Sequence, residues 1–204
     1  MKLYDDPRSG NGYKVRLLLA HLGHHYEYVP LDVAKGETQT TAFLAKNANG
    51  KIPLLELDDG RFLPESNAIL FFLAQATPYW PADAFEQAEV LQWLFFEQYS
   101  HEPNVATVRY WVSIRGTELS PVERELVETK RGQGRRALGV MNAHLATRSF
   151  FVGDRYTIAD IALYAYTHVA HEGGFDLAPF PAVRAWLDRV RSQPNHVRID
   201  AVSL

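Results

Sequence analysis

The pattern of apolar residues changes near residue 77, and this change restricts the possible folds more than any other feature of the sequence. Residues 1–77 contain short apolar runs that alternate between a period of two and a period near 3.6, which predicts strands interleaved with helices. The segment from Thr77 to Pro81 breaks the pattern, and no strand candidate of comparable quality follows it. We therefore expect a mixed domain over residues 1–77, a linker over 78–85 and an all-helical domain over 86–204.

The mixed domain is predicted to begin with a strand, a helix and a second strand. Residues 2–4 and 27–31 have strand character, and residues 14–23 carry apolar side chains at helical spacing. Strand, helix and strand within about 30 residues imply a parallel pair with a right-handed crossover. Further on, Asp58-Asp59-Gly60 separates two short strands and predicts a hairpin with a type I′ turn. A helix from residue 66 completes the order βαβ, connecting segment, ββα, which is that of a thioredoxin-like domain.

Proline and capping signals divide the helical half. Pro103 is expected to kink or split a long helix that begins near residue 84. Residues 120–123 (Ser-Pro-Val-Glu) form a capping box, which starts a helix that runs to about residue 146. Residues 157–160 (Thr-Ile-Ala-Asp) form a second box, with Asp in place of Glu, before a helix that we expect to be buried. Residues 181–191 carry one more amphipathic helix.

Composition excludes several kinds of protein. A formal net charge of −3 argues against a general nucleic-acid binder, which needs a basic surface to neutralise phosphates. No apolar run approaches the ~20 residues that span a bilayer, and we recognise no signal peptide, so we expect a cytoplasmic protein that acts without a membrane. Because the sequence has no cysteine, no mechanism can use a protein thiol. The histidines at 21, 24, 25, 168 and 171 lack nearby Cys or a suitable carboxylate, so we predict no metal site.

Three stretches together resemble motifs of the cytosolic glutathione transferases, in particular bacterial members of the serine-type or nu-like classes. Residues 47–53 (N-A-N-G-K-I-P) are similar to the family pattern N-P-N-G-[KQ]-[VI]-P, and residues 63–69 (L-P-E-S-N-A-I) to the pattern [LI]-x-[EQ]-S-x-A-I. Residues 151–160 are similar to the buried capping-box motif of the family. The order and spacing of the three stretches fit the family over nearly the whole chain.

The resemblance implies that the mixed domain binds glutathione as a co-substrate. The backbone of Ile52, before Pro53, would pair with the cysteinyl part like an added strand, and a cis bond there would expose that edge. At a helix N-terminus, Ser66 suits the α-carboxylate of the γ-glutamyl group and Glu65 could take its ammonium. The glycyl carboxylate needs a donor from residues 35–51. Candidates are Thr38, Gln39 and Lys51. Each of these residues also has an ordinary structural explanation. Pro53 fits a strand start, Glu65 and Ser66 fit a common helix N-terminus, and the three loop candidates fit a solvated loop.

The family also supplies a hydroxyl hydrogen bond to the glutathione sulfur at the start of the first helix. Ser9 takes the position of the serine in the serine-type classes, and Asn11 matches an asparagine of bacterial members that reduce disulfides with glutathione. Tyr4 resembles the tyrosine of the tyrosine-type classes, but an inward-facing strand tyrosine is more often part of a core. Serine and asparagine are also common turn residues, so the choice between Ser9 and Asn11 stays open at this point.

The resemblance places an electrophile pocket between the domains, against the long helix. Tyr99, His101 and Tyr110 are candidates for its lining, although core or interface packing explains each of them equally well. The leading function is attack of the glutathione thiolate on a small hydrophobic electrophile, as in detoxification, by a homodimer. Alternatives are glutathione-dependent disulfide or peroxide reduction and a non-catalytic partner-binding protein on this scaffold. Isomerisation in aromatic-acid breakdown is a further alternative, but the Ser-Ser-Cys-type motif of that class is not kept after Arg8.

Overall fold

The computed structural model describes residues 1–202, which form two compact units. Residues 1–77 and 194–202 make up the first unit, and residues 78–193 make up the second. We expected the tail after residue 193 in the helical domain, but it belongs to the first unit because it is bonded to the first helix, as described below. Within residues 1–202, no helix combines the length and the hydropathy needed to cross a membrane.

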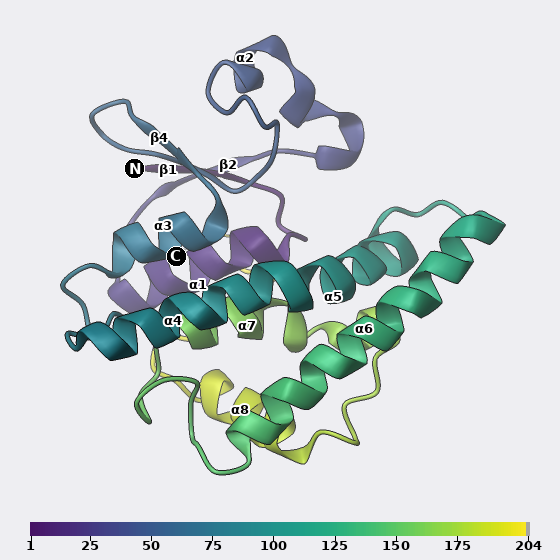
Figure 1. The fold of residues 1–204 in the computed structure, drawn as a ribbon. Coiled ribbons are helices and arrows are strands. Elements are labelled where there is room, and N and C mark those ends of the chain that lie inside the picture. The colour runs from purple at the N-terminus through teal and green to yellow at the C-terminus, as the bar shows by residue number, and fades with distance from the viewer. Residues whose placement is uncertain (203–204) are drawn as a thin grey trace. The chain divides into compact units, whose positions relative to one another are not determined.

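The first unit is built on a four-stranded sheet with the strand order β2-β1-β3-β4. β1 is parallel to β2 and antiparallel to β3, and β3 is antiparallel to β4. Helices α1 and α3 pack against each other on one face of this sheet (Figure 1). The predicted βαβ-ββα order is therefore confirmed. The elements are β1 (Lys2–Asp5), α1 (Gly10–Leu22), β2 (Glu27–Pro30), the 3₁₀ turns η1 (Val33–Lys35) and η2 (Glu37–Gln39), α2 (Thr41–Leu44), β3 (Leu54–Glu56), β4 (Phe62–Pro64) and α3 (Ser66–Ala74).

Helix α1 begins four residues earlier than the apolar spacing predicts. Ser9 is its N-cap, and the Ser9 Oγ accepts the backbone N–H of Gly12 at 3.2 Å. The glycine-rich residues after Ser9 resemble a turn in the sequence, but this cap and the packing of the first helical turn draw them into the helix. The helix ends at Gly23, which has a φ of 64°, as predicted.

The hairpin between β3 and β4 differs from the predicted type I′ turn. The N–H of Gly60 donates to the carbonyl of Leu57 at 3.0 Å, and the N–H of Leu57 donates to the carbonyl of Arg61 at 2.9 Å. Among the loop residues 58–60, only Gly60 has a positive φ, of 85°. The prediction was wrong because the loop has three residues, and such loops combine a type I turn with a single left-handed glycine.

The second unit is helical throughout its regular structure (Figure 1). Pro103 lies just after the π-helical segment Glu97–His101, which interrupts the regular α-helix, but the chain stays helical from residue 84 to residue 114, so the long helix is not split there. Without an N–H, proline fits a first helical turn and disrupts a helix interior. The elements are α4 (Ala84–Phe96), the π-helical segment η3 (Glu97–His101), α5 (Glu102–Arg109), the π-helical segment η4 (Tyr110–Ile114), α6 (Pro121–Leu145), α7 (Ile158–Thr167), the 3₁₀ turn η5 (Ala170–Gly173) and α8 (Pro181–Arg191).

Both predicted capping boxes are present. Ser120 and Glu123 exchange hydrogen bonds at the start of α6, and Thr157 and Asp160 do so at the start of α7. The fully buried Asp160 also accepts the indole N–H of Trp186 from α8 at 2.9 Å. Burial raises the pKa of Asp160 to about 6, against the opposing effect of these hydrogen bonds. Every residue of α7 is buried, as predicted, so this carboxylate joins two helices in the interior of the unit.

Candidate functional site

Ser9 stands at the positive end of the α1 dipole. The Ser9 N–H donates to the carbonyl of Asp6 at 2.8 Å, and its Oγ caps the N–H of Gly12. The side chain is only partly buried. The capping bond uses only a lone pair of the Ser9 oxygen, so the O–H can still donate a hydrogen bond to another group. Such a donor beside a helix N-terminus stabilises a negative charge nearby.

A second group of polar side chains joins the N-terminal turns of α1 and α3. The Ser66 hydroxyl donates to Asn11 Oδ1 at 3.3 Å and accepts from Lys14 Nζ at 3.3 Å. Lys14 Nζ also donates to Asn67 Oδ1 at 3.4 Å, and the lysine is fully buried. The structure thus brings together two predicted residues that lie 55 positions apart, Asn11 and Ser66. We did not predict Lys14, since nothing in the sequence distinguishes a buried lysine from an exposed one on the same helix.

Glu65 precedes α3 and has a backbone conformation that is rare for a residue with a side chain. Its φ is 71°, and its side chain makes no capping bond to α3. Glu65 is exposed, whereas the neighbouring Ser66 is buried as the first residue of the helix. Strained residues of this kind persist where the surrounding structure requires them, and they concentrate at functional sites. The pair offers a carboxylate for a cation beside a helix N-terminus for an anion.

The turn before Pro53 is held by Asn47, which we did not predict as a site residue. Asn47 Nδ2 donates to the carbonyl of Lys51 at 2.7 Å, and Asn47 Oδ1 accepts the N–H of Asn49 at 3.1 Å. The Asn47 side chain is buried. These bonds fix the backbone that leads into the Ile52-Pro53 peptide bond, which is cis.

The three candidates for the glycyl carboxylate differ in their surroundings. Thr38 is buried, and the amide of Gln39 donates to the carbonyl of Gly50 at 3.0 Å and to Thr38 Oγ1 at 3.3 Å. Lys51 is exposed and lies on the turn that Asn47 holds. Of the three, Lys51 therefore presents an accessible charge to an anionic ligand.

Tyr4 belongs to the interior of the first unit. Its hydroxyl donates to Glu56 Oε2 at 2.5 Å and accepts from Lys46 Nζ at 2.8 Å. The ring packs edge-on against Phe43, and the residue is buried. The interpretation of Tyr4 as a core residue agrees with its place in an apolar cluster with Phe43 and Leu54.

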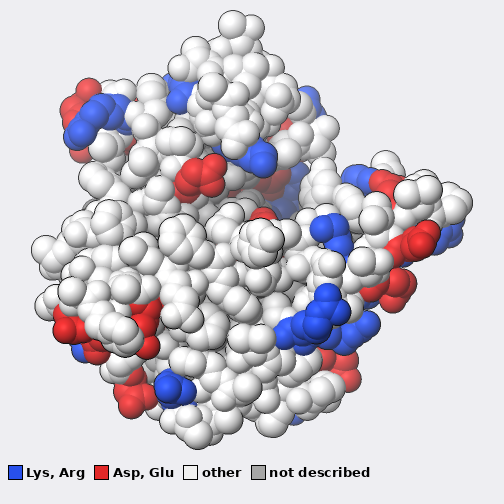
Figure 2. Space-filling model, viewed as in Figure 1, with Lys and Arg blue, Asp and Glu red and all other residues white. Residues whose placement is uncertain are grey.

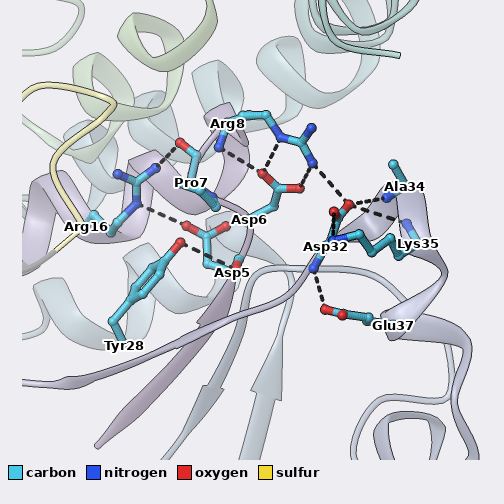
Figure 3. Close-up of polar contacts among 10 residues, drawn as sticks. All are labelled: Asp5, Asp6, Pro7, Arg8, Arg16, Tyr28, Asp32, Ala34, Lys35 and Glu37. Carbon is cyan, nitrogen blue, oxygen red and sulfur yellow. Dashed lines mark hydrogen bonds and ion pairs between the residues drawn. The ribbon is translucent and has the colours of Figure 1, made fainter. Parts of the chain in front are cut away.

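Charged side chains hold the loop that leads to Ser9 (Figure 3). The Asp6 carboxylate accepts the backbone N–H of Arg8 at 2.9 Å and two guanidinium bonds from Arg8, at 2.9 and 2.6 Å. Burial acts to raise the pKa of Asp6, but the bonds from Arg8 outweigh it and the pKa is lowered. Arg8 also reaches Asp32 at 3.3 Å, and Asp32 caps η1. The loop is therefore fixed on both sides of Pro7 before the chain enters α1.

The three residues predicted to line an electrophile pocket differ in exposure, and only Tyr99 borders the groove found in the second unit. His101 is fully buried, and its Nε2 lies 2.9 Å from Thr167 Oγ1. Tyr99 is 88% exposed and Tyr110 37% exposed. Tyr99 borders a groove of about 390 Å³, which neither His101 nor Tyr110 lines. The groove residues are Phe96, Tyr99, Ser100, Asn104, Gln133, Arg136, Ala137 and Val140.

Four cations follow closely on α6: Lys130, Arg131, Arg135 and Arg136. Two of them join α6 to other parts of the second unit, since Lys130 donates to the carbonyl of Pro103 at 2.8 Å and Arg131 Nε to the carbonyl of Gly173 at 3.0 Å. Figure 2 shows acidic and basic side chains interspersed on the face in view, with wide uncharged areas between them. Within residues 1–202, no three His, Cys, Asp or Glu side chains meet in an arrangement that could hold a metal ion.

Comparison with protein families gives two matches that together span most of the chain. Residues 1–75 match the model described as glutathione S-transferase, N-terminal domain. Residues 88–194 match the model described as glutathione S-transferase, C-terminal domain. A relative in Escherichia coli (strain K12), the disulfide-bond oxidoreductase YfcG, is 32% identical over 200 residues, which cover 94% of this chain and 90% of YfcG.

Solved structures give the same picture. A glutathione S-transferase from Pseudomonas fluorescens is 52% identical with a TM-score of 0.94, covering 97% of this chain and 98% of that protein. The structure of Ure2p in complex with glutathione is 27% identical with a TM-score of 0.84, covering 95% of this chain and 90% of that one.

Proposed function

Because the chain belongs to the glutathione S-transferase family, we propose that its first unit binds glutathione and activates the thiol for attack on small hydrophobic electrophiles. One observation carries this proposal: Asn11 of α1 and the buried Ser66 of α3 are hydrogen-bonded, so two helix N-termini meet beside Ser9. Backbone N–H groups and helix dipoles favour anions at such a place. A tripeptide with carboxylates and an ionisable thiol fits this environment.

In the proposed complex, each part of glutathione has a partner in the first unit. The γ-glutamyl carboxylate binds the N-terminus of α3 at Ser66, and Glu65 takes the ammonium. The backbone of Ile52 pairs with the cysteinyl part, as a sheet edge does with an added strand. Lys51 is the partner for the glycyl carboxylate, because it alone of the three candidates carries a positive charge, and its side chain is exposed.

The proposed chemical step begins with the loss of the thiol proton to solvent. The Ser9 hydroxyl donates a hydrogen bond to the resulting thiolate, and the positive end of α1 favours its charge. The thiolate then forms a carbon–sulfur bond with the electrophile, whose leaving group departs with the electron pair of the broken bond. Asn11 is the second candidate for the sulfur contact.

A second candidate function is glutathione-dependent disulfide reduction. It is supported by the relative named as a disulfide-bond oxidoreductase and by the place of Asn11 beside Ser66. In this reaction the thiolate attacks a mixed disulfide, forming glutathione disulfide and releasing the other sulfur as a thiolate. The same bound thiolate serves both reactions, so only the acceptor distinguishes them.

The test measures glutathione affinity by calorimetry, together with turnover on a chlorodinitrobenzene-type electrophile and on a glutathione mixed disulfide. We expect Ser66→Ala to weaken binding about tenfold or more, because it removes a hydroxyl at the anion site. Ser192→Ala, at the exposed end of α8, is the matched control and leaves binding unchanged. No glutathione binding would overturn the proposal. Binding with only disulfide turnover would favour the second function, and binding without turnover a partner-binding role.

We also propose that the protein is a homodimer, on the basis of an apolar row in the second unit. Leu91, Phe95 and Tyr99 follow one another at intervals of four residues, and Phe95 and Tyr99 are 70% and 88% exposed. Large exposed apolar side chains in a row are typical of an interface. We expect sedimentation to give the mass of a dimer and Phe95→Glu to give a monomer, whereas a monomeric unmodified protein would contradict the proposal.

A further inference from the structure

Resting on the proposed function, we propose that Arg16 is a positioning residue, which joins the C-terminal tail, residues 194–202, to the loop before Ser9 and so holds Ser9 in place against the thiol. Arg16 lies on α1, seven positions after Ser9, and its side chain is almost completely buried. The residue does not need to touch glutathione for this role. Its effect passes through the backbone of the loop and through the first turn of α1.

On the side of the active-site loop, Arg16 makes two bonds (Figure 3). Arg16 Nε donates to Asp5 Oδ2 at 3.0 Å, and both side chains are buried. Arg16 Nη2 donates to the carbonyl of Pro7 at 3.1 Å, two residues before Ser9. The guanidinium therefore joins Asp5, at the end of β1, to Pro7 in the loop that follows.

On the opposite side, the same guanidinium binds the tail. Arg16 Nη1 donates to the carbonyls of Ile199 and Ala201, at 2.6 and 2.7 Å. These two bonds and the two bonds to Asp5 and Pro7 use the fork geometry that only arginine has. A lysine at this position would keep the charge beside Asp5 but could not reach all four acceptors.

Other side chains of α1 fix the path of the tail. Tyr13 donates its hydroxyl proton to the carbonyl of Val197 at 2.7 Å. His21 Nδ1 lies 2.8 Å from the carbonyl of Pro194, near the end of the helix. The acceptors of these bonds are backbone carbonyls, and one tail side chain also contributes, since His196 Nε2 lies 3.3 Å from the Tyr13 hydroxyl. Along the tail, the contacts with α1 pass from His21 to Tyr13 and end at Arg16, which lies between them.

The first turn of α1 rests directly on the carboxylate that Arg16 holds. A Cβ built on Gly12 would lie 1.7 Å from Asp5 Oδ1, so no side chain fits between the helix and Asp5. Gly12 is also the residue whose N–H is capped by the Ser9 Oγ. A shift of the Asp5 carboxylate therefore shifts the cap, and with it the hydroxyl that is proposed to face the sulfur. Small misplacements of such a group reduce turnover strongly.

Two variants test the inference without placing a new group at the glutathione site. Arg16→Lys keeps the cation beside Asp5 and removes the fork, and a truncation after Arg198 removes both tail acceptors and leaves Arg16 intact. For each we expect kcat to fall about tenfold and the pKa of bound thiol to rise by about one, with the KM for glutathione changed less than about twofold. Combining the two changes adds little, because both break one linkage.

The control is Arg198→Lys, since Arg198 is exposed and its guanidinium bonds to Asp200 at the surface. It leaves kcat and the thiol pKa unchanged. If Arg16→Lys and the truncation lower the melting temperature but leave the pH profile and kcat as they are, the residue is structural and the inference fails. If the unmodified protein does not turn glutathione over, the proposed function fails first and the inference with it. Should one variant not fold, the other decides.

Discussion

Replacing Ser9 with alanine separates two roles of one hydroxyl, the helix cap that the structure shows and the sulfur contact that we propose. The Ser9 Oγ accepts one N–H, from Gly12 at 3.2 Å. Loss of such a cap lowers the free energy of unfolding by about 1 kcal/mol. Loss of a hydrogen bond to a charged sulfur costs about 1.5–3 kcal/mol, which raises the pKa of the bound thiol by about 1–2.

The two effects are measured in separate assays. Urea unfolding reports the cap, and ultraviolet absorbance of the bound thiolate against pH reports the sulfur contact, together with the pH profile of turnover. Ser9→Thr keeps a hydroxyl that can both donate and accept, so it is the matched control and retains most of both effects. Ser9→Asp keeps the cap acceptor without a donor at neutral pH, so stability is retained while the thiol pKa rises.

One result would refute the reasoning. If Ser9→Ala destabilises the fold by about 1 kcal/mol but leaves the thiol pKa and the pH profile unchanged, the Ser9 hydroxyl is a cap and nothing more. Asn11→Ala would then be expected to raise the thiol pKa, since Ser66 fixes the orientation of the Asn11 amide through its Oδ1.

Three further perturbations test other parts of the structure. Asn47→Ala removes the bonds that hold the turn before Pro53, and calorimetry should show glutathione affinity about tenfold weaker with kcat unchanged. Gly12→Ala should lower the free energy of unfolding in urea by about 1–3 kcal/mol through overpacking. Gly132→Ala, whose Cβ meets nothing within 4 Å, should raise it by up to about 1 kcal/mol, and equal effects of the two variants would contradict this. Burial raises the pKa of Asp160 from 3.8 to about 6, so between these pH values the folded state retains a proton that the unfolded state releases. The free energy of unfolding should therefore fall by up to about 3 kcal/mol as pH rises from about 4 to about 6. Asp160→Asn should lower stability overall and remove this slope, and an unchanged slope would show that another group causes it.

Much of the fold could be predicted from the sequence because its signals are local. A capping box requires particular side chains three positions apart, so Thr157 and Asp160 predict the start of α7 whatever the helix packs against. Pro103 marks the place where the long helix departs from regular α geometry for a similar reason, since proline lacks the N–H that a helix interior needs. The motifs around Pro53 and Ser66 identified the family because their residues are close together in the chain.

Only the tertiary structure decided how distant groups combine at the candidate site. Lys14 is buried against Ser66 of another helix, and Arg16 binds tail carbonyls 183 and 185 positions away. Every residue has a backbone carbonyl, so no pattern of side chains in the sequence predicts which carbonyls will accept these bonds. Apolar spacing shows that a helix has a buried face, but the atoms that meet that face depend on the path of the rest of the chain. Long-range hydrogen bonds are therefore where the sequence alone stops being informative about this protein.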